Sequence, residues 1–255
     1  MTLVGLGTGS AVAAFGSVPP SGWTNDQRNY LIAWTVAPDA QVPSDAMWVG
    51  PHKSFASARL LPATLLVLKA DVTAPDGTLI LPAGTKLNGL VSKTKSACTL
   101  EAPPSKGLAA VWFYGADRYL CFIDDNGDGR FDRYFRRAAA TAGILIGIGR
   151  FPKKAVAMQP VAYSEEDPDS ILDAPRIYVQ YGWFASFVDK LVFQTCLIRD
   201  SNDRACLYPT NDVKRTTLPS NFEALGARFQ VEEKENNRVR VRMLTQFVPQ
   251  PLVIY

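Results

Sequence analysis

The chain has 255 residues, of which 47% are hydrophobic and 20% are charged, and it contains 18 glycines and 18 prolines. This composition excludes a globally disordered chain and favours many short elements over long helices. The net charge of +3 is too small to indicate a nucleic-acid partner. The single histidine argues against a metal centre built from several imidazoles.

The first residues are small and apolar. Ala11 and Ala13 fit the small-x-small cleavage pattern of a secretory signal, although no Lys or Arg precedes Arg28. We interpret residues 1–21 as a signal remnant or, alternatively, as a flexible N-terminal segment. Residues 22–255 then form one β domain, which could be split into two small lobes near position 150.

Two segments lack a clear period. Residues 22–57 hold three tryptophans among prolines and polar residues, and we expect irregular structure there. Residues 138–149 form an apolar stretch of 12 residues with three glycines, which is too short to span a bilayer. Periodicity alone leaves open whether this stretch is a buried strand or a short buried helix. We therefore expect no transmembrane span.

From Arg59 onward, apolar runs alternate with turn residues. The segments 74–77 and 82–84 combine proline with glycine, which predicts tight turns between short strands. Further strands are expected over residues 87–91, 109–114, 118–123, 155–163, 176–184 and 187–198. Short strands separated by turns are typical of a mainly β protein. We predict an antiparallel sandwich or barrel with short hairpins, little helix and an irregular N-terminal segment.

The clearest hairpin lies near the end of the chain. Asn236 and Asn237 stand at its turn, where asparagine tolerates a positive φ. Three arginines alternate with the apolar residues of the second arm and should face outward together, namely Arg238, Arg240 and Arg242. We expect them to form cross-strand ion pairs with Glu232 and Glu233, the alternative being a surface for a polyanion.

The chain has four cysteines and no C-x-x-C motif, which disfavours a zinc ribbon. Of the three disulfide connectivities, the local one is the most economical: Cys196 with Cys206 across a hairpin, and Cys98 with Cys121. Two such bridges indicate an oxidising compartment, the periplasm or the cell exterior. The alternative is four buried thiols in a cytosolic protein.

The segment FIDDNGDGRFDRYF contains the most specific pattern of the chain, D-x-[DN]-x-[DN]-G. Oxygen donors at alternating positions of a tight loop can converge on Ca²⁺. The expected ligands are the side chains of Asp124, Asn126, Asp128 and Asp132 and the backbone carbonyl of Arg130. The pattern resembles the calcium loops of EF-hands, dockerins and thrombospondin-like repeats over about 12 residues, and this resemblance implies Ca²⁺ as a cofactor.

The loop departs from an EF-hand at position 12, where Phe135 replaces the bidentate glutamate. We therefore expect a weak, structural calcium site in a hairpin instead of a calcium sensor. The alternative is a plain solvated hairpin, because Asn126-Gly127 and Asp128-Gly129 are both strong turn dipeptides.

Little else in the sequence indicates chemistry. The chain has no G-x-S-x-G elbow that would supply a nucleophile for His52. The sequence also places no second carboxylate opposite the acidic residues between 165 and 173. We therefore predict a secreted or periplasmic non-catalytic β protein. It would act as a binding module, or as a structural or accessory component of a cell-envelope or surface assembly with a protein partner. The alternative is a secreted hydrolase for polysaccharide or peptide, with acids from residues 124–132 or 165–173.

Overall fold

The computed structural model describes residues 22–39, 45–74, 77–101, 118–138, 144–198 and 204–253. Within these ranges the regular structure is almost all antiparallel strand, and the helical structure consists of single 3₁₀ turns. The predicted mainly β fold is therefore confirmed. The predictions for residues 1–21 and 109–114 fall outside the described residues.

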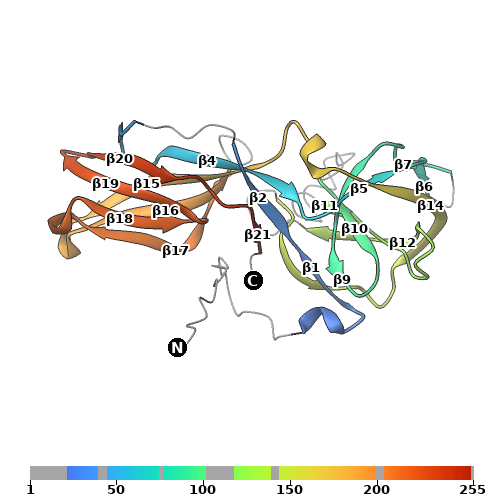
Figure 1. Cartoon of the computed structure of the whole chain (residues 1–255). Helices are drawn as coiled ribbons and strands as arrows, with labels where there is room; N and C mark the ends of the chain where they lie inside the picture. Colours follow the sequence, from blue (N-terminus) through green and yellow to red (C-terminus); the bar gives the residue numbers. More distant parts are fainter. Residues whose placement is uncertain are drawn as a thin grey trace, which may run out of the picture.

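Two groups of strands lie side by side (Figure 1), and we call them the barrel lobe and the sandwich lobe. The barrel lobe contains β1 (Asn29–Ile32), β5 (Leu65–Leu68), β6 (Val72–Thr73), β7 (Leu79–Leu81), β8 (Lys86–Gly89), β9 (Val91–Ser92), β10 (Ser96–Thr99), β11 (Arg118–Ile123), β12 (Arg130–Ala138), β13 (Gly147–Arg150) and β14 (Val156–Glu166). The sandwich lobe contains β2 (Trp34–Pro38), β3 (Met47–Val49), β4 (Lys53–Pro62), β15 (Arg176–Ala185), β16 (Lys190–Ile198), β17 (Arg204–Lys214), β18 (Ser220–Ala224), β19 (Ala227–Glu235), β20 (Arg238–Thr245) and β21 (Gln250–Leu252). The 3₁₀ turns are η1 (Trp23–Asn25), η2 (Pro168–Ser170), η3 (Ser186–Val188) and η4 (Arg215–Thr217).

The barrel lobe is a closed barrel of six strands in the order β10-β11-β12-β14-β5-β8. Successive side chains of a strand point to opposite faces, so each strand supplies both an inner and an outer layer. On β11, Leu120 and Phe122 pack inside the barrel, whereas Tyr119 and Cys121 pack outside it. A three-stranded sheet, β13-β1-β9, covers that outer layer and buries it.

The sandwich lobe packs a six-stranded sheet, β17-β16-β15-β4-β2-β21, against a four-stranded sheet, β18-β19-β20-β3. The core between them is rich in phenylalanine. The ring of Phe222 stacks between Phe193, at 4.5 Å between centroids, and Phe229, at 5.1 Å. The hairpin predicted near the end of the chain is confirmed, because Val231 pairs with Val241 and Asn236 has a φ of 50°.

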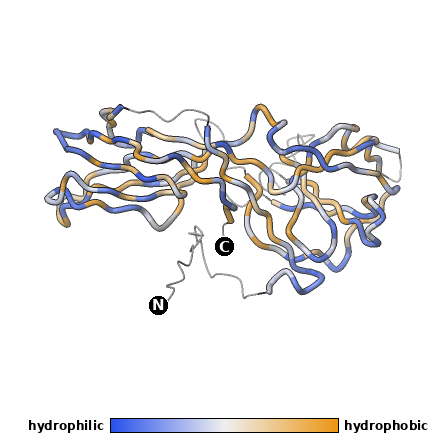
Figure 2. Tube along the Cα trace, viewed as in Figure 1, coloured by the Kyte–Doolittle hydropathy of each residue, from blue (hydrophilic) through white to orange (hydrophobic). Residues whose placement is uncertain are grey.

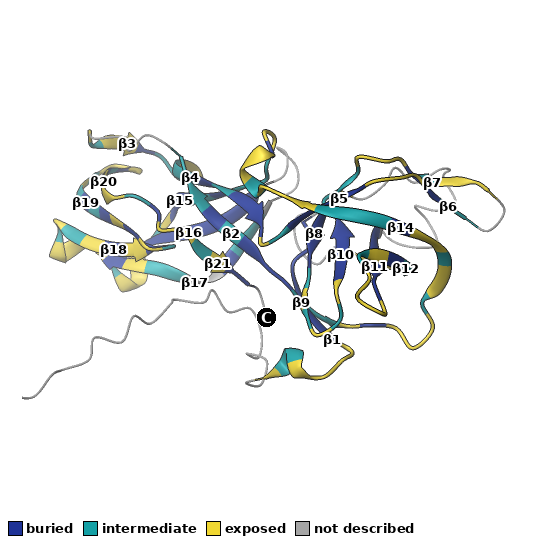
Figure 3. Cartoon of the chain, turned by 45° about the vertical axis from the view of Figure 1, so that its right-hand side comes forward, coloured by how far each residue is buried: buried dark blue, intermediate teal, exposed yellow. Residues whose placement is uncertain are grey.

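The chain passes between the lobes three times: from β1 to β2, from β4 to β5, and from β14 to β15. The six-stranded sheet therefore takes strands from both sides of position 150. Residues 22–57, for which irregular structure was expected, contain β1, β2, β3 and the start of β4. Hydrophobic stretches run through the strands of both lobes (Figure 2), and the buried stretches gather at the centre of each lobe (Figure 3).

No helix in the described part of the chain is long and apolar enough to cross a membrane.

Candidate functional site

The loop singled out by the sequence joins β11 to β12 at one end of the barrel. Gly127 and Gly129 adopt positive φ values of 73° and 83°, a backbone conformation that residues with a Cβ adopt at a cost. These two glycines let the backbone fold over the carboxylate of Asp124, which is only 1% exposed. Asp124 therefore lies at the centre of the loop.

The carboxylate of Asp124 accepts four hydrogen bonds. Its Oδ1 atom accepts from the backbone N–H groups of Gly127 at 2.7 Å and Asp128 at 3.2 Å. Its Oδ2 atom accepts from the N–H of Gly129 at 3.0 Å and from the hydroxyl of Tyr163 at 2.8 Å. A carboxylate has about four lone-pair sites, so the loop and β14 use all of them.

Among the described residues, the hydroxyl of Tyr163 is the donor to the Asp124 carboxylate that comes from outside the loop. Burial raises the pKa of Tyr163 well above its usual range, and the hydrogen bond to Asp124 and the charges of Asp124 and Asp128 raise it further. The phenol therefore stays protonated and donates over the whole ordinary pH range.

We expect Tyr163→Phe to lower the free energy of unfolding by about 1 kcal/mol, because one hydrogen bond to a buried carboxylate is lost. An unfolded tyrosine ionises near pH 10, so a raised folded-state pKa contributes stability that is complete below pH 10 and is lost as the pH rises further. Urea unfolding is measured at pH 8 and above pH 10. Between these two pH values the free energy of unfolding should fall less in the variant than in the wild-type protein. An equal fall in both proteins would contradict the raised pKa of Tyr163.

The remaining predicted ligands also bond within the loop. Asp128 Oδ1 accepts from the N–H of Arg130 at 2.9 Å, and Asn126 Oδ1 accepts from the N–H of Asp128 at 3.0 Å. Asp132 Oδ2 accepts from the N–H of Asp125 at 3.1 Å. Among the described residues, no group of three or more His, Cys, Asp or Glu side chains lies close enough to hold a metal ion. Calcium binding therefore stays a prediction.

The four cysteines lie in two cross-strand pairs at disulfide distance, in the pairing favoured by the sequence. The sulfur atoms of Cys98 on β10 and Cys121 on β11 are 2.02 Å apart, and those of Cys196 on β16 and Cys206 on β17 are 2.13 Å apart. Each pair joins directly opposite residues of neighbouring strands. The barrel lobe and the sandwich lobe thus hold one pair each.

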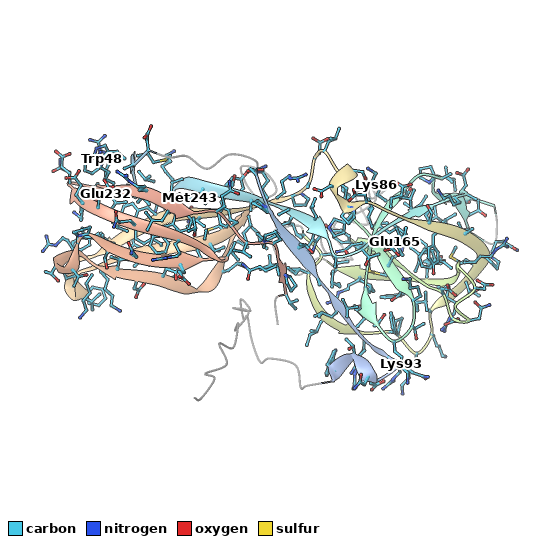
Figure 4. The ribbon with its side chains drawn as sticks, in the orientation of Figure 1. Trp48, Lys86, Lys93, Glu165, Glu232 and Met243 are labelled. Atoms are coloured by element: carbon cyan, nitrogen blue, oxygen red, sulfur yellow. A yellow bond between two sulfur atoms is a disulfide. The ribbon has the colours of Figure 1, made fainter. Side chains whose placement is uncertain are left out.

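Two of the three arginines of β20 form the cross-strand ion pairs expected from the hairpin pattern, whereas Arg238 lies 4.0 Å from Glu235 instead. Arg240 lies 3.3 Å from Glu232 and 3.1 Å from Glu233, and Arg242 lies 2.9 Å from Glu232. Arg238 stands over the ring of Trp48, 5.5 Å from its centroid. Trp48 and Glu232 lie at the far end of the sandwich lobe (Figure 4).

His52 and the acidic residues between 165 and 173 lie in different parts of the fold. His52 is exposed in the turn before β4 and has a positive φ of 57°. Of the acidic residues between 165 and 173, Glu165 and Glu166 pair with β5 at the end of β14. Asp169 forms an ion pair with Arg59 at 2.8 Å.

A basic cleft of about 550 Å³, which the sequence patterns do not predict, lies in the barrel lobe. Four cationic side chains line it, together with tyrosines and small apolar residues, and no described lining residue carries a carboxylate. The cations are Arg136, Arg137, Arg150 and Lys154.

The cleft forms where β12 extends beyond the last residue that pairs with β14. The last pair between the two strands is Tyr134 with Val156, whereas the pairing with β11 continues to Ala138. The end of β12 therefore has an open edge, and β13 and the segment 151–155 lie along it.

Arg137 is held in a fixed position beside this edge. Its guanidinium donates to the hydroxyl of Tyr30 and, at 2.7 Å, to the carbonyl of Ile148. A Cβ at Gly149 would lie 1.9 Å from the guanidinium nitrogen, so only glycine leaves room for it. Burial raises the pKa of Tyr30, against the opposing effect of Arg137, so the Tyr30 hydroxyl stays neutral beside the cation.

A signal for this cleft is present in the sequence. Between Asp132 and Glu165 the chain carries six basic residues and no acidic one. The basic residues form two short groups, Arg133, Arg136 and Arg137, and then Arg150, Lys153 and Lys154. The sequence does not show that the fold brings the two groups together around one opening.

No protein-family model matches the chain, and no curated protein or solved structure matches it significantly.

Proposed function

We propose that the chain is a disulfide-stabilised binding or structural protein of an oxidising compartment, either the periplasm or the cell exterior. It would act as a component of an envelope or surface assembly. Ca²⁺ would bind at the Asp124 loop in exchange for some of the hydrogen bonds that the Asp124 carboxylate accepts in this structure. The observation that carries the proposal is the presence of one cysteine pair at disulfide distance in each lobe. Such bridges persist in oxidising environments and are rare where thiols are kept reduced.

A protein partner is supported by the apolar tip of the sandwich lobe. Within the turn from β15 to β16, Phe187 is 90% exposed and Val188 is 43% exposed, and Trp183 nearby is 40% exposed. Single exposed apolar residues are common, but three in one hairpin favour a contact surface.

The hydrolase alternative would need two carboxylates that face one cleft. No described residue that lines the basic cleft carries a carboxylate. A second cleft of about 310 Å³ lies in the sandwich lobe. Asp39 is the one carboxylate among its described lining residues, and it forms an ion pair with Arg176. Neither cleft supports the alternative.

The compartment is tested by counting thiols in protein taken from its own cells. Cells are lysed in an alkylating agent without reductant, and intact mass and peptide masses are measured. We expect no alkylated cysteine before reduction, and the bridged peptides 98–121 and 196–206. Four alkylated cysteines would overturn the proposal.

Calcium binding is tested by thermal melts in millimolar Ca²⁺ and in EDTA. A ligand at 100 times its dissociation constant stabilises the native state by about 2.7 kcal/mol, which raises the Tm by roughly 5–10 °C in a chain of this size. Asp128→Asn keeps an oxygen for the Arg130 N–H and removes one charge, so we expect it to reduce the shift. Asp173→Asn, an exposed site outside the loop, is the matched control. No calcium-dependent shift in the wild-type protein would contradict this part of the proposal.

A further inference from the structure

The four cations of the basic cleft differ from the other clustered arginines of the chain in what faces them. The arginines of β20 lie within 4.0 Å of glutamates on their own hairpin. Within the described ranges, one cleft cation has an acid within 4.0 Å: Arg150 lies 3.6 Å from Asp26, which does not line the cleft. Among the described residues, Arg136 and Lys154 form no ion pair. The cleft therefore carries positive charge that the described protein does not neutralise.

The side chains are arranged to receive an anion without large movement. Arg137 is fixed by Tyr30 and the Ile148 carbonyl, and Arg150 is held by Asn29 at 2.8 Å and lies 5.5 Å from the Trp23 ring. These contacts reduce the side-chain entropy that a ligand would otherwise have to overcome. Arg136 and Lys154 are exposed and free to close on a ligand from the rim.

We propose that this cleft binds a phosphoryl group on a small molecule. Guanidinium groups match the oxygens of phosphate in a bidentate geometry, and a phosphate carries up to two negative charges near neutral pH. A single carboxylate would leave most of the four cations unpaired. The volume of about 550 Å³ suits a small ligand, and Tyr134 and Pro152 provide walls for its uncharged part. This inference depends on neither the disulfides nor calcium.

The test is isothermal titration calorimetry of the whole chain with inorganic pyrophosphate in 150 mM NaCl. EDTA is present in all samples, so that chelation of Ca²⁺ by pyrophosphate does not contribute. The test variant is Arg136→Ala with Lys154→Ala, because both residues are exposed and their loss leaves no buried group unpaired. The control variant is Arg238→Ala with Arg242→Ala, which changes the net charge equally in the sandwich lobe.

We expect the wild-type protein and the control to bind pyrophosphate with similar affinity. The test variant should bind about 100-fold more weakly, or about tenfold for each lost cation. Gly149→Ala should also weaken binding, because its methyl group displaces Arg137 and the Tyr30 hydroxyl that holds it, while every charge is kept. Equal affinities in the test and control variants would overturn the site, because the attraction would then come from net charge alone.

The phosphoryl group could belong to a free compound or to a lipid headgroup. A parallel arm uses phosphatidylcholine vesicles with and without phosphatidic acid, and measures sedimentation with the vesicles. Binding of pyrophosphate without vesicle binding supports a free ligand. Vesicle binding that requires phosphatidic acid and is lost in the test variant supports a headgroup. Binding of neither probe would overturn the proposal.

Discussion

Reduction of both cysteine pairs is expected to lower the free energy of unfolding by about 6 kcal/mol. The paired cysteines are 23 and 10 positions apart in the chain. In the chain-entropy model, bridges closing loops of these lengths each contribute about 3 kcal/mol, and the longer loop contributes slightly more. Because domains are commonly stable by only about 5–15 kcal/mol, the reduced protein should be close to unfolding at ambient temperature.

Urea unfolding of the oxidised and the reduced, alkylated protein measures this loss. Paired replacements separate the lobes: Cys98→Ala with Cys121→Ala for the barrel, and Cys196→Ala with Cys206→Ala for the sandwich. Cys98, Cys121 and Cys196 are buried and Cys206 is half-buried, and each replacement by alanine removes one sulfur atom, so the cavities are small. Midpoints that are unchanged on reduction would contradict the expected role of the bridges.

Asp124→Ala is expected to lower the free energy of unfolding by about 3–5 kcal/mol. The substitution removes the acceptor of four hydrogen bonds from a site that is 1% exposed. Three backbone N–H groups and the Tyr163 hydroxyl then lose their partner, and an unpaired buried donor costs about 1–3 kcal/mol. Relaxation of the loop toward water should recover part of this cost, because Asn126 and Asp128 are exposed.

The matched control for this substitution is the neighbouring Asp125→Ala. Asp125 is exposed and forms an ion pair with Arg133 at the surface, and such pairs contribute about 0–1 kcal/mol. Both variants remove one negative charge from the same loop. A difference between their urea midpoints therefore reports the burial and hydrogen bonding of Asp124 and not the loss of charge. A difference of less than 1 kcal/mol between them would mean that Asp124 does not organise the loop.

Features that depend on neighbouring residues could be predicted from the sequence. The hairpin of β19 and β20 follows from alternation around Asn236, and the pairing of Cys196 with Cys206 follows from the polar turn between them. The Asp124 loop follows from its glycines. Each of these involves strands that are adjacent in the chain, so that turn chemistry and register determine the contact.

Features that depend on distant strands could not be predicted in the same way. Tyr30 and Arg137 meet only because β13 pairs with β1 alongside the barrel. The basic cleft is therefore a product of topology. The segment 22–57 was expected to be irregular for a related reason. Tyr30 and Trp34 are both buried, but they belong to different sheets, so no single alternating pattern covers the segment.

The position of β21 has a consequence for how the molecule acquires its structure. Residues 250–252 lie beside β2, with Leu252 opposite Trp34, and β2 in turn lies beside β4. The six-stranded sheet therefore cannot be completed until residues 250–252 have been synthesised. Until then, the edge of β2 that pairs with β21 has no partner strand. Contacts between such distant positions slow folding and leave apolar edges exposed to other chains. We expect a growing or truncated chain that lacks residues 250–252 to need a chaperone to stay in solution.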